Sequence, residues 1–119
     1  MAPKLDEALQ ALVGEQLSSV TFVMDYWQLA FDGHGLTVFT RTTVSGPDWR
    51  VENTDEQFRN RLCERIGRKV AAVAFHSGDY LAITFDDASI IKASMREQDY
   101  SGLEAFNFYP RSSKAPYAV

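Results

Sequence analysis

Two stretches of the chain place apolar residues every four positions, which is the spacing of one face of a helix. The first stretch ends at Gly14 and the second at Gly67, and glycine readily takes the left-handed conformation that closes many helices. Thr54 and Gln57 have the spacing of a capping box, so we expect the second helix to begin there. The periodic apolar positions are Leu5, Leu9, Val13, Phe58, Leu62 and Ile66.

After each glycine the apolar period changes to two, which indicates antiparallel strands. The expected strands are "VTFVM", "YWQLAF" and "LTVFTRTTV" after Gly14, and "VAAVAF", "YLAITF" and "SIIKASM" after Gly67. Short polar segments, "DGHG" at 32–35, "SGD" at 77–79 and "DD" at 86–87, supply the turns between them. The alternation predicts a core that contains Trp27, Leu29, Phe31, Leu81, Ile83 and Phe85.

The sequence of the first half aligns with that of the second half when residues 53 apart are compared. After one inserted residue the separation becomes 54. Gly14 then aligns with Gly67, Phe31 with Phe85, and Asp32 with Asp86. The match favours an internal duplication, with repeat 1 at 3–52, repeat 2 at 54–109 and an irregular tail at 110–119. The segments 46–52, "GPDWRVE", and 102–109, "GLEAFNFY", align as possible fourth strands of the two copies.

These elements predict a single α+β domain over residues 1–119. We expect two pseudo-twofold repeats, each a helix plus an antiparallel three- to four-stranded meander. Together they contribute six to eight strands and two short helices. Blocks of helix and hairpin argue against an α/β fold with a parallel sheet. Whether the sheet is open, sandwich-like or barrel-like is left open.

Composition narrows the possible functions. The chain has 119 residues, 45% of them hydrophobic, and a net charge of −4, which argues against a nucleic-acid partner. Its single cysteine excludes an internal disulfide and fits a reducing, cytoplasmic location. There is no apolar run of about 18 residues, so we expect no membrane association.

Side chains that could carry chemistry are few. His34 lies in a turn with Asp32, and with Asp86 it could form part of a metal site, but we expect an exposed turn instead. His76 precedes Ser77 and Asp79, yet three neighbours in one hairpin do not make a catalytic triad.

Cys63 is expected to be an inert thiol, although its basic neighbours could lower its pKa. Two histidines and one cysteine do not supply an ordinary zinc site. We therefore predict no catalytic residues, no cofactor and no metal.

The remaining candidates form a possible interaction surface. One part is a basic cluster, which is either a solvated helix face or a surface for an acidic protein partner or a phosphate-bearing ligand. The other part is the aromatic group at the end of "EAFNFY". Because side chains alternate along a strand, Phe106 and Phe108 should lie on one face and Tyr109 on the other. The surface comprises Arg59, Arg61, Arg65, Arg68, Lys69, Phe106, Phe108 and Tyr109.

The chain resembles a family of small uncharacterised bacterial proteins. The resemblance lies in "VGEQL" and "IGRKV", in hairpins that end "AFDG" and "TFDD", and in "EAF" at 104–106, where Phe106 stands in place of an expected Trp. The family implies no enzymatic activity, and some such proteins are similar in fold to immunity proteins that neutralise bacterial toxins.

We therefore expect a non-enzymatic interaction or immunity-like accessory domain. We expect it to form a homodimer through sheet edges or aromatic patches, and an unidentified protein partner is also possible. The alternative is a small-molecule-binding domain with its ligand pocket between the two repeats.

Overall fold

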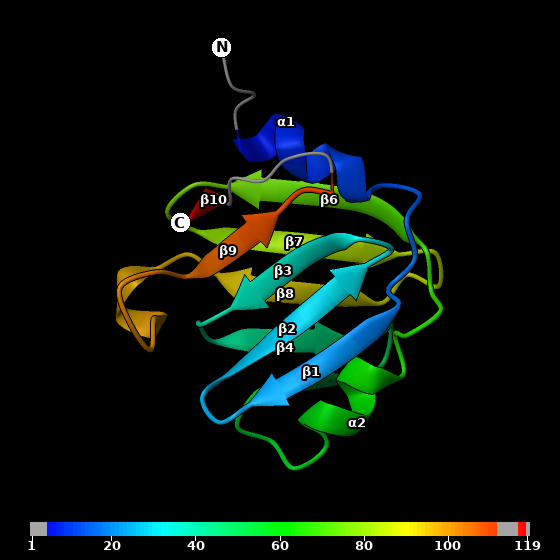
Figure 1. Cartoon of the computed structure of the whole chain (residues 1–119). Helices are drawn as coiled ribbons and strands as arrows, with labels where there is room; N and C mark the ends of the chain where they lie inside the picture. The colour runs from blue at the N-terminus through cyan, green and yellow to red at the C-terminus, as the bar shows by residue number, and fades with distance from the viewer. Residues whose placement is uncertain (1–4, 112–116, 119) are drawn as a thin grey trace.

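The computed structural model describes residues 5–111 and 117–118. The described residues form ten strands in two five-stranded antiparallel sheets, together with two short α-helices (Figure 1). The prediction of six to eight strands was therefore too low, and the sheets form a sandwich. No helix among the described residues is long and apolar enough to cross a membrane.

The first sheet has the order β1-β2-β3-β9-β10. Its strands are β1 (Ser19–Val23), β2 (Tyr26–Phe31), β3 (His34–Val38), β9 (Phe106–Tyr109) and β10 (Tyr117–Ala118). The second sheet has the order β5-β4-β8-β7-β6. Its strands are β4 (Thr42–Ser45), β5 (Arg50–Glu52), β6 (Val70–His76), β7 (Tyr80–Phe85) and β8 (Ile90–Ser94).

Each sheet takes three consecutive strands from one half of the chain and two strands from the other half. The meander β1-β2-β3 is extended by β9 and β10, and the meander β8-β7-β6 is extended by β4 and β5. The run at 36–44, which we expected to be one strand, is broken at 39–41. Residues 36–38 form the end of β3 in the first sheet, and residues 42–44 belong to β4 in the second sheet.

The predicted equivalence of 46–52 and 102–109 as fourth strands was correct only for 102–109, which contains β9, because 46–52 contains β5, the strand after β4. By position, β4 and β9 are the fourth strands, because each pairs with the third strand of the opposite half. The segment at 50–52 is a fifth strand, as β10 is in the other sheet. The predicted tail at 110–119 contains β10, while 112–116 and 119 lie outside the described residues, as does the start of repeat 1.

The segments that follow the two helical regions pair with each other. Gly14 and Gly67 have φ of +90° and +92°, the left-handed conformation expected for them. Gln16 and Lys69, which are 53 residues apart, form an antiparallel bridge. Four backbone hydrogen bonds flank it: Gly14 N to Val70 O, Gly67 N to Leu17 O, Val70 N to Glu15 O and Leu17 N to Arg68 O.

The helical elements are shorter than expected, and each packs on the first strand of the opposite half. They are α1 (Leu5–Leu9), which continues as the 3-10 turn η1 (Gln10–Leu12), and α2 (Phe58–Cys63). The region of α1 and η1 packs on β6, and α2 packs on β1. The capping box is wrong, because α2 begins at Phe58 and its N-cap, Gln57, makes no side-chain hydrogen bond.

The core lies between the two sheets. Leu29, Phe31, Leu81, Ile83 and Phe85 are all buried, as the alternation predicted. Trp27 is only partly buried against the core, and its indole nitrogen is the one buried side-chain polar atom without a hydrogen-bond partner in the described part of the chain.

Candidate functional site

The outer face of the first sheet is built from side chains that alternate with the buried core positions. Because Leu29, Leu36 and Phe108 point into the core, their neighbours along each strand point outward. These neighbours form three rows across the sheet, as the strand register shows. The first row is Ser19, Ala30, Gly35 and Tyr109; the middle row is Thr21, Gln28, Thr37, Asn107 and Ala118; the third row is Val23, Tyr26 and Phe39. We call these twelve residues the first-sheet face.

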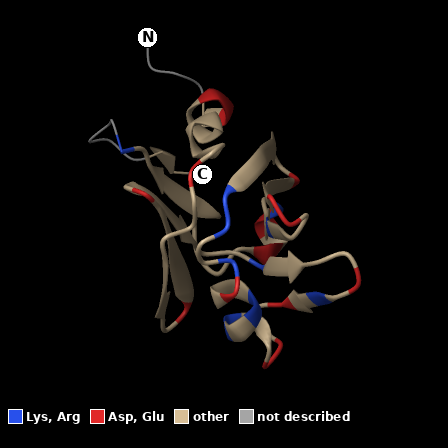
Figure 2. Ribbon diagram, turned by 90° about the vertical axis from the view of Figure 1, so that its right-hand side faces the viewer, with Lys and Arg blue, Asp and Glu red and all other residues tan. Residues whose placement is uncertain are grey.

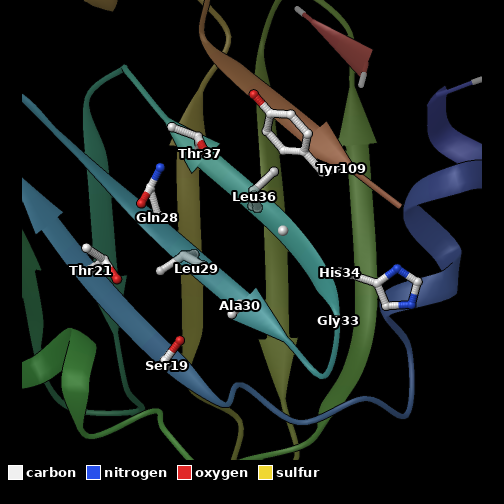
Figure 3. Close-up of a pocket in the computed structure, with 11 residues that line it drawn as sticks. Ser19, Thr21, Gln28, Leu29, Ala30, Gly33, His34, Leu36, Thr37 and Tyr109 are labelled. Atoms are coloured by element: carbon white, nitrogen blue, oxygen red, sulfur yellow. The ribbon is translucent and has the colours of Figure 1, made fainter. Parts of the chain in front are cut away.

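Small side chains in the first row leave a shallow hollow of about 380 Å³. Figure 3 shows Ser19 and Ala30 on adjacent strands at its floor, and the ring of Tyr109 over β3 at its rim. The β-carbon of Tyr109 lies 3.6 Å from where a β-carbon on Gly35 would stand, so the two residues are in direct contact across β3 and β9. The hollow is open to solvent.

Bulky apolar side chains gather at the opposite end of the same face. The rings of Tyr26 and Phe39 lie 5.1 Å apart. Phe39 also lines a second hollow of about 390 Å³ with Leu103, which is 99% exposed. Val23 is 37% exposed beside Tyr26. One end of the face is therefore small and hollow, and the other is bulky and apolar.

The first-sheet face contains no charged side chain among its twelve residues. In Figure 2 the first sheet is tan along its strands, and acidic residues colour only turns at its ends. The outer face of the second sheet differs, because Arg50, Glu52 and Lys92 point outward from it. A chain with 24% charged residues thus leaves these twelve positions uncharged, and Glu104 lines the second hollow at the end of the face.

Part of the predicted interaction surface stabilises the fold instead. Arg65 is only 6% exposed, and its Nη1 lies 3.1 Å from Oδ2 of Asp87. Arg68 reaches the same oxygen at 3.5 Å. The other oxygen of Asp87 accepts hydrogen bonds from the backbone N–H and the hydroxyl of Ser89. The cluster therefore joins the C-terminal end of α2 to the turn between β7 and β8.

The ionised form of Asp87 is favoured by this arrangement. Burial alone would raise the pKa of Asp87, but the two hydrogen bonds from Ser89 and the charges of Arg65 and Arg68 outweigh it. The pKa of Asp87 is consequently lowered from its usual value.

The other basic residues pack on aromatic rings or lie exposed. The guanidinium of Arg59 lies 5.2 Å from the ring of Phe22, and that of Arg61 lies 4.2 Å from the ring of Trp49. Lys69 is exposed. The basic surface for an acidic or phosphate-bearing partner thus stays a prediction, with Arg65 removed from it.

The aromatic part of the predicted surface is divided as the alternation indicated. Phe106 and Phe108 are fully buried, so they belong to the core and not to an exposed surface. Tyr109 is 42% exposed and lies on the first-sheet face. The strand therefore contributes one aromatic side chain to the outer surface.

His34 is buried, contrary to the exposed turn that we expected. Its Nδ1 accepts a hydrogen bond of 3.0 Å from the backbone N–H of Arg111. Gly33 leaves room for Arg111, whose side chain would collide with a β-carbon at that position. Burial, and then the charge of Arg111, lower the pKa of His34, although Glu15 acts in the opposite direction.

The remaining candidates are not assembled into a catalytic or metal site. His76 is exposed, and its ring lies 4.6 Å from that of Tyr80. Cys63 is exposed. Within residues 5–111 and 117–118, no three His, Cys, Asp or Glu side chains group as metal ligands.

The sequence contained a signal for the first-sheet face that we did not use. The outward positions of the strands predicted at 20–24 and 26–31 include Thr21, Gln28 and Ala30, and all three are uncharged. The fourth strand of the sheet, β9, could not be assigned from local pattern, because it comes from the other half of the chain.

Comparisons with known proteins assign no family to this chain. No protein-family model, no curated protein and no solved structure matches it.

Proposed function

We propose that this chain is a non-enzymatic protein-interaction domain that self-associates, with an immunity-like accessory role. The observation that carries the proposal is the uncharged, partly aromatic first-sheet face. Both the resemblance to small bacterial proteins and the accessory role remain part of the proposal.

The composition of the first-sheet face is typical of the centre of a protein interface. Interface centres are depleted in charged residues and enriched in tyrosine and phenylalanine. Burying this face against another protein removes no charge from water, so the desolvation cost is low. Half-buried Tyr26 and Phe39 and exposed Tyr109 supply rigid aromatic side chains to this face.

Contact through the face is favoured over contact through sheet edges. The edge strand β6 is covered by η1, where the side chain of Gln10 donates to the carbonyl of Val73 at 2.9 Å. The edge strand β1 packs against α2. The other two edges, β5 and β10, are only three and two residues long, which limits the pairing that they can offer.

The alternative of a ligand pocket between the two repeats has little structural support. The space between the sheets is filled by large side chains that are fully buried, among them Phe31, Phe85, Phe106 and Phe108. The hollows described above lie on the outer surface. A small-molecule ligand would therefore have to bind on a face rather than in the core.

We also infer that the two halves arose by duplication and are related by a pseudo-twofold axis. The inference is supported by the shared order of strands in the two sheets and by the bridge between Gln16 and Lys69, whose flanking hydrogen bonds are exchanged by a shift of 53 residues. In such a chain, two ancestral copies would have exchanged their fourth and fifth strands.

Self-association is tested by sedimentation velocity on the purified full chain across the micromolar range. We expect the weight-average mass to rise with concentration toward twice the monomer mass. A monomer mass at every concentration would contradict the proposal.

A further inference from the structure

We propose that the first-sheet face binds a second copy of this chain, face to face, around a two-fold axis that lies in the interface. The axis runs across the strands, along the middle row. The inference rests on the proposed self-association and adds to it the surface, the partner and the orientation of the two copies.

The surface is accessible for such a contact. Figure 1 shows the strands β1, β2, β3 and β9 toward the viewer, and neither α1 nor α2 crosses in front of them. Both hollows described above open on this side of the sandwich. A second sheet could therefore approach to the usual packing distance of about 10 Å.

The shape of the face selects the orientation of the partner. A two-fold axis along the middle row exchanges the two ends, so the third row of one copy lies over the first row of the other. The bulky Tyr26 and Phe39 then enter the hollow above Ser19, Ala30 and Gly35. Protein interfaces pack as densely as protein interiors. A bulky row therefore packs better against a hollow row than against another bulky row.

The absence of charge explains why a second copy is a suitable partner. In an isologous contact a residue on the two-fold axis faces its own copy, so a charge in the row along the axis would meet a like charge. The middle row of the first-sheet face carries no charge. The corresponding row of the second sheet contains Glu52 and Lys92, and the same axis there would bring each of them against its own copy.

The size of the face predicts a reversible dimer. Four strands about 4.8 Å apart and five residues at about 3.3 Å each cover roughly 19 by 17 Å. That plane is smaller than the roughly 800 Å² per partner of a standard interface. Exposed Leu103 beside the third row adds contact area. We therefore expect dissociation that can be measured at micromolar concentration.

Gln28 provides a specific test, because a residue of the middle row faces its own copy across the axis. The side chain is exposed, and its neighbours across the strands in the sheet register are Thr21 and Thr37. Charged replacements should therefore not disturb the fold. Gln28→Glu and Gln28→Lys each place two like charges together. We expect each variant alone to raise the dimer Kd at least about tenfold. An equimolar mixture of the two should recover the dimer, because it pairs unlike charges.

Ala82 is the matched control. It occupies the corresponding central, outward position of the second sheet, between Ala74 and Lys92. Ala82→Glu and Ala82→Lys should leave the wild-type Kd unchanged, measured by sedimentation velocity as for the Gln28 variants. Urea melts of all four variants exclude unfolding as the cause of any change.

The outcomes separate this inference from the proposed function. A wild-type dimer that both Gln28 variants retain would overturn the face-to-face contact and leave self-association standing. Loss of the dimer in both variants without recovery on mixing would overturn the orientation of the axis. A monomeric wild-type chain would overturn both proposals.

Discussion

Replacing Asp87 with alanine tests whether the buried basic cluster is a structural device. The substitution removes the carboxylate that lies 3.1 Å from the buried guanidinium of Arg65. Arg65 keeps the exposed carboxylate of Glu64 at 3.4 Å and the carbonyl of Arg61 at 3.3 Å. The substitution also removes the acceptor for the hydroxyl and the backbone N–H of Ser89, which is 1% exposed.

The expected loss of stability is about 2–4 kcal/mol. Breaking a buried ion pair by removing one partner costs about 3–5 kcal/mol. The side chain of Asp87 is 25% exposed, so water can replace part of what Arg65 loses, and we reduce the figure accordingly. The unsatisfied Ser89 adds about 1–3 kcal/mol, of which water can recover part by the same route.

Urea melts measure the effect as a change in the midpoint at an unchanged slope. Asp86→Ala is the control, because Asp86 is exposed and we expect a change within about 0.5 kcal/mol. A loss below about 1 kcal/mol for Asp87→Ala would refute the structural role of the cluster and return Arg65 to the interaction surface.

Acid should reproduce part of this loss in the wild type. The pKa of Asp87 is lowered on folding, so its contribution is complete above the normal value of 3.8. Stability is lost as the pH falls through the pKa of the folded state. In Asp87→Asn this part of the acid dependence should be absent, and melts between pH 2 and about 6 would reveal it.

Three further predictions concern the core, a histidine and a turn. Phe85→Ala should lower the free energy of unfolding by about 3–5 kcal/mol in urea melts, since Phe85 is 1% exposed. Leu103→Ala, at an exposed position, should change it very little. A loss below about 1 kcal/mol for Phe85→Ala would place Phe85 at the surface. The pKa of His34 is lowered below 6.5, so the unfolded chain binds the proton first and the free energy of unfolding should fall as the pH drops below about 6.5. His34→Asn should remove this fall, whereas the control His76→Asn should keep it. An unchanged pH profile of stability in His34→Asn would contradict the assignment. Ala88 has φ of +70°, so Ala88→Gly should raise the free energy of unfolding by about 0.5–1 kcal/mol, and a lower thermal midpoint would show that the turn is not strained.

The elements that local pattern predicts well are the two meanders. In 26–31 and 80–85 the alternation of apolar residues correctly predicted the buried side chains except Trp27, which is only partly buried. One face of each strand packs on the core and the other does not. The predicted left-handed conformation of Gly14 and Gly67 was likewise correct, since this conformation at the end of a helical pattern strongly favours glycine.

Local pattern failed where contacts from distant residues decide the structure. Residues 36–44 are rich in β-branched residues and contain no Gly, Pro, Asn or Asp that would indicate a turn, yet the chain changes sheets there. Thr40 donates to the carbonyl of Asp99, and the side chain of Asn53 accepts from Thr42. These partners lie 59 and 11 residues away, so nothing in the local pattern marks the change.

Candidate site residues show the same limit. Arg65 belongs to a run of basic residues of a kind that is usually solvated. Its burial depends on Asp87, 22 residues away, and on Trp49, whose ring lies 5.3 Å from its guanidinium. Phe106 and Phe108 are buried because β9 inserts beside β3, which no local pattern predicts. The uncharged first-sheet face could have been predicted in part, because its outward positions on β1 and β2 follow from alternation alone.

The exchange of strands between the halves has a consequence for synthesis on the ribosome. The edge of β3 that receives β9 has no partner until residues 106–109 leave the exit tunnel, long after β3 itself has emerged. Until then Leu36 and Val38 lie beside an open edge. Nascent chains that stall before residue 106 should therefore be good chaperone clients. Emergence of β9 should make them resistant to protease in a single step.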